Sequence, residues 1–97
     1  MIRRIVKMTF QKDKTDDFLK WFEEHKNKIK NFEGCLHLEL WKDAEQPNIF
    51  YTFSIWDSQE SIEKYRQSEV FQKVWSYTKT LFQDKPMAFS ATQEIIV

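Results

Sequence analysis

The sequence predicts an α+β fold with the element order βαββαβ, and two observations support this prediction. Four segments alternate between apolar and polar residues with a period of two, which is typical of strands: residues 2–10, 35–41, 48–56 and 87–97. Two segments between them, residues 15–33 and 58–82, have apolar residues at helical spacing. The chain has 97 residues and no linker-like stretch, so we expect a single domain over residues 1–97.

The first strand and the first helix each have one apolar side. In the strand, that side carries Arg4, Val6, Met8 and Phe10. The helix is expected to begin at Thr15, whose hydroxyl can cap the free amides of the first turn. Its apolar stripe contains Phe18, Trp21, Phe22, Ile29 and Phe32, with His25 inside it. Gly34 follows the helix, where a residue with a left-handed conformation commonly closes it.

Residues 34–56 form the centre of the pattern, as two strands joined by a polar loop. The first of these strands sets two groups of residues on opposite faces: Leu36, Leu38 and Leu40 against Cys35, His37, Glu39 and Trp41. The second does the same with Ile49, Tyr51, Phe53 and Ile55 against Phe50, Thr52, Ser54 and Trp56. The loop between them contains Asp43, Pro47 and Asn48, which favour turns. This stretch therefore predicts a hairpin.

The second helical segment is less regular than the first. Asp57 or Ser58 can cap it, and Asp57 with Glu60 has the spacing of a capping box. The apolar stripe slips near residues 67–69, which indicates two consecutive helices with Ser68 as a new N-cap. Pro86 ends the helical region, and residues 87–97 are expected to form the last strand.

Composition excludes several classes of protein. Lysine plus arginine equals aspartate plus glutamate, and this zero net charge argues against a nucleic-acid binder. No apolar run approaches the about 20 residues that a membrane span needs. Cys35 is the only cysteine, so the chain has no internal disulfide. We expect a cytoplasmic protein that interacts with neither nucleic acid nor membrane.

The element order predicts a four-stranded antiparallel sheet with both helical segments on one face, the ferredoxin-like arrangement. The other face of such a sheet is bare. Its occupants are apolar in either assignment of the faces, whether Phe50, Trp41 and Trp56 or the alternate set. A bare apolar face is usually covered by a partner. We therefore expect a homodimer whose two sheets pack face to face.

A set of short motifs resembles the antibiotic biosynthesis monooxygenase-like family of dimeric α+β barrels. In chain order the motifs are Gly34-Cys35-Leu36, Leu40-Trp41-Lys42-Asp43, Pro47-Asn48, Ile55-Trp56 followed by Ser58, Glu60 and Ser61, and Ser68-Glu69-Val70-Phe71. The resemblance implies a barrel dimer with a pocket between sheet and helices in each subunit. Some members of this family oxidise quinols or polycyclic phenols with molecular oxygen and no bound metal or flavin. Close relatives degrade haem, and others have non-oxidative roles.

The sequence departs from the family pattern in four places. Ser54 stands where members often carry glutamate, and Tyr65 stands where many carry histidine. Trp75 occupies the position of the axial histidine in the haem-degrading relatives, and tryptophan cannot ligate iron. The first strand also lacks the asparagine of those relatives. These departures argue against haem degradation, and no cofactor is expected.

Five residues are candidates for the site. His25 is the only titratable side chain in the apolar stripe of the first helix, and it could take a proton from a phenolic substrate. Tyr65 could hydrogen-bond a substrate oxygen, while Trp21, Phe71 and Trp75 could contact a planar ring. The alternatives are a packed histidine bonded to a backbone carbonyl and ordinary helix-on-sheet packing.

Other side chains suggest weaker possibilities. Cys35, His37 and Glu39 share a face in the alternation, but zinc needs three or four ligands and nothing else completes the set. Cys35 has no adjacent cation, which indicates a structural role. The function implied by the resemblance is thus a cofactor-independent monooxygenase acting on a quinol or polyphenol. The alternatives are a noncatalytic homodimer that binds small ligands or acts in stress response, and an isomerase that uses the same pocket.

Overall fold

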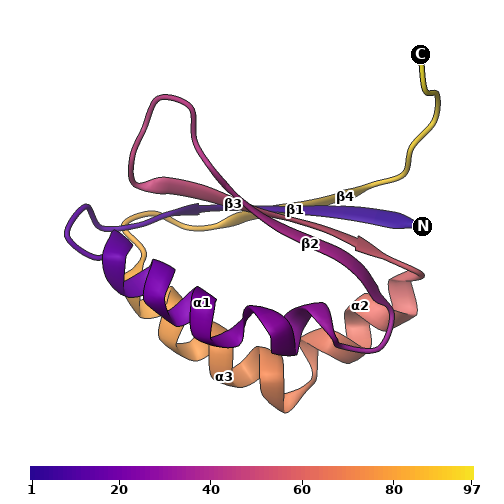
Figure 1. Cartoon of the computed structure of the whole chain (residues 1–97), viewed down its shortest axis with the longest axis horizontal. Helices are drawn as coiled ribbons and strands as arrows, with labels where there is room; N and C mark the ends of the chain where they lie inside the picture. The colour runs from indigo at the N-terminus through magenta and orange to yellow at the C-terminus, as the bar shows by residue number, and fades with distance from the viewer.

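The computed structural model describes all residues 1–97 and contains four strands and three α-helices (Figure 1). Their order and bounds are β1 (Ile2–Thr9), α1 (Thr15–Lys30), β2 (Cys35–Lys42), β3 (Ile49–Trp56), α2 (Gln59–Arg66), α3 (Glu69–Thr78) and β4 (Met87–Ala91). A short 3₁₀ turn, Lys79–Leu81, follows α3. The order βαββαβ is confirmed, with the second helical segment divided in two.

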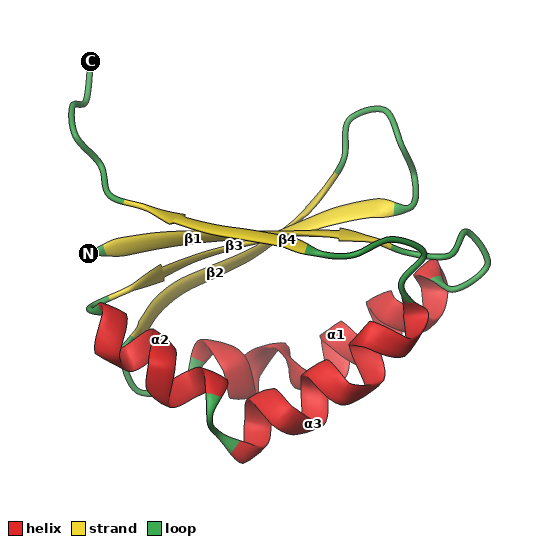
Figure 2. Cartoon of the chain, turned by 180° about the vertical axis from the view of Figure 1, so that it is seen from behind, coloured by secondary structure: helices red, strands yellow, loops and turns green.

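The four strands form one sheet in the order β2-β3-β1-β4, and each neighbouring pair is antiparallel. All three helices lie on the same side of this sheet, and the opposite side carries no element (Figure 2). The expected ferredoxin-like α+β fold is therefore confirmed. No helix is long and apolar enough to span a bilayer.

A bulge at the start of β2 corrects the predicted faces of this strand. Cys35 pairs with Trp56, but the next pair is His37 with Ile55, so Leu36 is an extra residue. Cys35 consequently points into the core while His37 lies on the bare face. Leu36 is 45 % exposed, whereas Leu38 and Leu40 are half-buried on the helix side of the sheet. The prediction that Cys35 and His37 share a face was wrong.

The structure also decides between the two assignments of the bare sheet face. Phe50 and Trp56 are 4 % and 2 % exposed and belong to the core, so the first assignment was wrong for both. Trp41 does lie on the bare face, where its ring stacks on Phe53 with centroids 5.0 Å apart. The alternate set of β3, which includes Tyr51, Phe53 and Ile55, faces away from the helices.

The core has two parts. The larger joins β1 and β3 to α1 and the 3₁₀ turn, and it consists of Met8, Phe10, Phe18, Phe50 and Leu81. The smaller joins the other end of the sheet to α2, and it consists of Cys35, Trp56 and Ile62. Partly buried side chains continue both clusters inward, among them Phe22 and Trp75 in the first and Tyr65 in the second. These side chains lie on the helix side of the sheet, where the cavity described below is found.

The helix starts agree with the sequence at two of three places. Ser58 accepts a hydrogen bond from the Ser61 amide at 3.2 Å, and Ser68 accepts one from the Phe71 amide at 3.1 Å. The new N-cap at Ser68 is therefore confirmed. Thr15 is the first residue of α1 rather than its cap, and Lys14 in the cap position makes no side-chain bond.

The last strand is shorter than predicted. β4 ends at Ala91 because its pairing with β1 ends at Arg3. Residues 92–97 have no regular structure and are exposed, and they run away from the sheet on the side opposite the helices (Figure 1).

Candidate functional site

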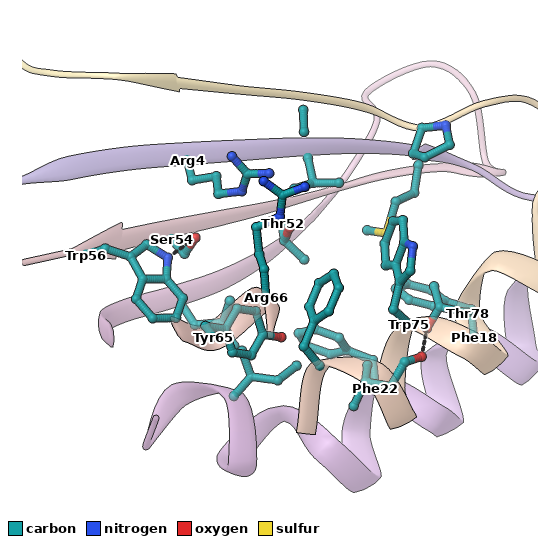
Figure 3. Close-up of a pocket in the computed structure, with 18 residues that line it drawn as sticks. Arg4, Phe18, Phe22, Thr52, Ser54, Trp56, Tyr65, Arg66, Trp75 and Thr78 are labelled. Atoms are coloured by element: carbon teal, nitrogen blue, oxygen red, sulfur yellow. Dashed lines mark hydrogen bonds between the residues drawn. The ribbon is translucent and has the colours of Figure 1, made fainter. Parts of the chain in front are cut away.

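A cavity of about 290 Å³ lies between the sheet and the helices. All four strands and all three helices contribute to its walls, and 12 of its 18 lining residues are hydrophobic. The labelled side chains in Figure 3 surround this space from both layers. Its volume is at the lower end of the about 300–1,000 Å³ that is usual for small-molecule sites. The cavity therefore has room for a small ligand of one or two rings.

One wall of the cavity is a chain of aromatic rings. Trp56 and Tyr65 have ring centroids 5.1 Å apart, and Tyr65 meets Phe71 edge-on at 5.2 Å. Phe71 then stacks on Trp75 at 5.8 Å with an interplanar angle of 13°. Because Ser68 restarts the helix, Tyr65 at the end of α2 and Phe71 and Trp75 on α3 all line the cavity. Aromatic faces of this kind suit a flat apolar ligand.

Tyr65 is the only phenol among the lining residues. Burial raises the pKa of its hydroxyl above the ordinary value, with a smaller contribution from Cys35. Near neutral pH the hydroxyl therefore stays protonated and can donate a hydrogen bond. Figure 3 shows it directed into the space between the labelled side chains.

Two arginines form the polar end of the cavity, and sequence reasoning missed both. Arg4 comes from β1 and Arg66 from the last residue of α2, and their guanidinium groups lie next to each other in Figure 3. No aspartate, glutamate, histidine or cysteine lines the cavity. The available signal was the position of Arg4 on the apolar face of the first strand, in line with Val6 and Met8.

His25 and Trp21 do not line this cavity. The Nδ1 atom of His25 lies 2.8 Å from the Trp21 carbonyl, so this nitrogen donates to it, and the two ring centroids are 3.9 Å apart. The indole of Trp21 donates to the Val74 carbonyl at 3.2 Å, which ties α1 to α3. His25 is 5 % exposed and borders a separate cavity of about 200 Å³ between these helices. Of the five candidates, the structure brings only Tyr65, Phe71 and Trp75 together.

The polar residues of β2 form a network on the bare face, away from the cavity. His37 Nε2 lies 2.5 Å from Glu39 Oε2, and the Trp41 indole donates to Glu39 Oε1 at 2.7 Å. The hydrogen bonds from Trp41 and then His37 lower the pKa of Glu39. Cys35 is buried on the other side, and burial raises the pKa of its thiol. No three side chains of the types that bind metals come together.

Solved structures share this fold closely. A conserved protein from Methanosarcina mazei Go1 superposes with a TM-score of 0.90 at 16% identity, covering 96% of this chain and 92% of that one. A structure named antibiotic biosynthesis monooxygenase gives 0.91 at 16% identity, with 98% and 100% covered. PA3566 from Pseudomonas aeruginosa gives 0.85 at 16% identity, with 97% and 94% covered. At these identities the likeness shows the fold alone.

Sequence comparison supplies the family. No curated protein matches the chain. A sequence model of the family described as antibiotic biosynthesis monooxygenase matches residues 1–75, which is more than half of the chain. This match includes β1, the hairpin, α2 and the part of α3 up to Trp75. The chain therefore belongs to the antibiotic biosynthesis monooxygenase family.

Proposed function

We propose that residues 1–97 act as a single-domain monooxygenase that needs no metal or flavin and oxidises a small planar aromatic such as a quinol or polyphenol. The observation that supports this most is the aromatic-walled cavity of about 290 Å³ between sheet and helices. Family membership supports the monooxygenase class, and the size of the cavity supports a substrate of one or two rings. Tyr65, Phe71 and Trp75 are the proposed substrate contacts.

The proposed chemistry balances without an outside reductant. A hydroxyarene gives up four electrons to one molecule of oxygen. One oxygen atom forms the new carbonyl of a quinone, and the other leaves as water with the two hydrogens that the ring and its hydroxyl lose. The apolar walls exclude water from the reactive anion, and Tyr65 donates a hydrogen bond to a substrate oxygen.

His25 is poorly placed to accept a proton from a ligand in the cavity. Its Nδ1 is held by the Trp21 carbonyl, and no imidazole or carboxylate lines the cavity. This geometry favours the packed role of His25, and its catalytic role stays a prediction. The same observation supports a second candidate function, a noncatalytic protein that binds a small aromatic ligand.

Oxygen uptake separates these two functions. The full-length chain is mixed with a panel of quinols and naphthols in an oxygen electrode, and we expect uptake above the rate without protein together with quinone absorbance. His25→Ala is measured beside it. Unchanged turnover in a folded His25→Ala variant would end the proposed role of His25. If no compound is consumed but one raises the melting temperature, the protein is a binder and the oxygenase proposal fails.

We also propose that the protein is a homodimer joined through the bare face of the sheet. This face carries a run of large apolar side chains with no element over them: Ile5, Trp41, Tyr51, Phe53, Ile55, Met87 and Phe89. Met87 and Phe89 are 58 % and 52 % exposed, and a surface of this kind is usually covered by a partner. A second copy of the same sheet offers a matching surface, and zero net charge does not oppose its approach. The cytoplasmic location expected from the sequence stays a prediction.

A further inference from the structure

We propose that the cavity binds its aromatic ligand as an anion, with Arg4 and Arg66 holding the charged oxygen of a carboxylate or phenolate. This inference rests on the proposed function only in taking the aromatic wall as the place for the ring. It adds a chemical class that neither the family nor the fold specifies.

The position of Arg4 leaves its charge free to meet a ligand. In the sheet Arg4 stands between Ser54 of β3 and Ser90 of β4, and both neighbours are small and uncharged. Arg4 Nη1 donates to Ser90 Oγ at 3.2 Å, which holds the guanidinium on the cavity side of the sheet. Ser54 Oγ accepts a hydrogen bond from the Trp56 indole at 2.9 Å, and no hydrogen bond joins it to Arg4.

Arg66 approaches the same point from the helix layer. Its side chain is 51 % exposed, so it stands at the mouth of the cavity. Its one acidic partner is Glu63, whose Oε1 is 3.6 Å from Arg66 Nη1, a loose and exposed pair. Two guanidinium groups and one carboxylate leave one positive charge without a partner at this end.

Burial and the neighbouring charge of Arg66 lower the pKa of Arg4, and the charge of Glu63 opposes this only in part. Arg4 stays protonated at neutral pH, so the two like charges repel each other across the mouth of the cavity. An anionic oxygen between them would relieve this repulsion and accept charge-assisted hydrogen bonds from both. Tyr65, the residue before Arg66, belongs to the aromatic wall and brings it beside the arginines, so one ligand can fill both parts.

The test compares two probes of the same shape, naphthoate and the neutral naphthalenemethanol, by isothermal titration calorimetry on the full chain. We expect naphthoate to bind at least about tenfold more tightly than naphthalenemethanol. The affinity for naphthoate should fall as the salt concentration rises, and the affinity for naphthalenemethanol should not. Arg66→Met should abolish most of this preference. Lys64→Met is the matched control, because Lys64 is on the same helix, is exposed and does not line the cavity.

Two further variants keep the result clear. Arg4→Met should also remove the preference, and Ser54→Asp should weaken naphthoate binding by placing a carboxylate opposite Arg4. Equal affinity for both probes, or a preference that survives Arg66→Met and Arg4→Met, would overturn the inference. The proposed function fails separately: naphthoate binding that depends on the arginines, without oxygen uptake from any phenol, would leave an anion-binding protein that is no oxygenase.

Discussion

Replacing Gly34 by alanine should destabilise the fold strongly, because two independent costs meet at this residue. Gly34 joins α1 to β2 with φ at +92°, a conformation that residues with a side chain rarely adopt. An added Cβ would also lie well under 3.0 Å from both side-chain atoms of Ser61 and 2.9 Å from Asp57 Oδ1. The Gly34 carbonyl accepts the Asp57 amide at 2.9 Å, which leaves the backbone little freedom to move.

The magnitude follows from these two costs. Forcing alanine into the left-handed region costs about 1–2 kcal/mol. Overpacking against Ser61 adds about 1–3 kcal/mol, because Ser61 is on α2 and is held by Asp57 at 2.5 Å. The expected loss is thus about 2–5 kcal/mol, a large part of the stability of a small domain. The melting temperature should fall by at least about 8 °C.

Urea unfolding, followed by circular dichroism at one fixed protein concentration, measures this loss. The same substitution is then made in a Ser61→Gly background, where the clash with the Ser61 side chain is gone, while the backbone cost and the 2.9 Å approach to Asp57 Oδ1 remain. We expect Gly34→Ala to cost about 1–3 kcal/mol less in that background than in the wild type. An equal loss in both backgrounds would show that Ser61 is not in the way. A loss below about 1 kcal/mol in the wild type is less than the left-handed backbone alone should cost, and it would contradict the strain at Gly34 as well.

Three further predictions concern the cavity and the sheet face. Burial keeps the Tyr65 hydroxyl protonated in the folded state, whereas the unfolded state loses this proton above pH 10, so Tyr65 should lower stability by up to about 1.4 kcal/mol per pH unit there. Tyr65→Phe should reduce the slope of stability against pH in urea unfolding, and Tyr77→Phe should not; the raised pKa values of Cys35 and Tyr51 account for the slope that remains. Phe53→Arg should give a monomer in size exclusion with light scattering, whereas Leu19→Arg on α1 should leave the mass unchanged; a wild-type monomer at micromolar concentration would refute the dimer. Trp75→Leu should weaken naphthoate binding about tenfold in calorimetry while keeping the helical circular dichroism, and unchanged affinity would mean that the ring of the ligand lies elsewhere.

Local patterns in the sequence predicted most of the fold. The division of the second helical segment was visible because a slip in the apolar stripe coincides with Ser68, a residue that can cap a new helix. The bulge at Leu36 was not visible, because an extra residue in a strand changes the pairing with its neighbour and leaves the alternation of the strand itself almost intact. The faces assigned to Cys35 and His37 were wrong for that reason.

The site was only partly predictable. Tyr65, Phe71 and Trp75 follow from helical spacing once the break at Ser68 is allowed for. His25 has equally good spacing on α1. Whether a residue of α1 faces the sheet or the neighbouring helix depends, however, on how α1 is rotated about its axis. The hydrogen bond from Trp21 to the Val74 carbonyl shows that this part of α1 faces α3. Arg4 and Arg66 are 62 residues apart in the sequence, and the sequence alone gives no sign that they meet.

The arginine pair changes what the proposed reaction requires of the protein. A phenol bound with its oxygen between two guanidinium groups ionises more readily, because nearby positive charge favours the anion. A phenolate is also more electron-rich than the phenol and so gives electrons to oxygen more easily. Arg4 and Arg66 could therefore do the work assigned to a base, and the proton would leave to water at the half-exposed mouth beside Arg66. On this reasoning His25→Ala leaves turnover unchanged while Arg66→Met lowers it and raises the pH at which the substrate ionises in the cavity. The reverse pattern, with turnover lost in a folded His25→Ala and kept in Arg66→Met, would return the role of base to His25.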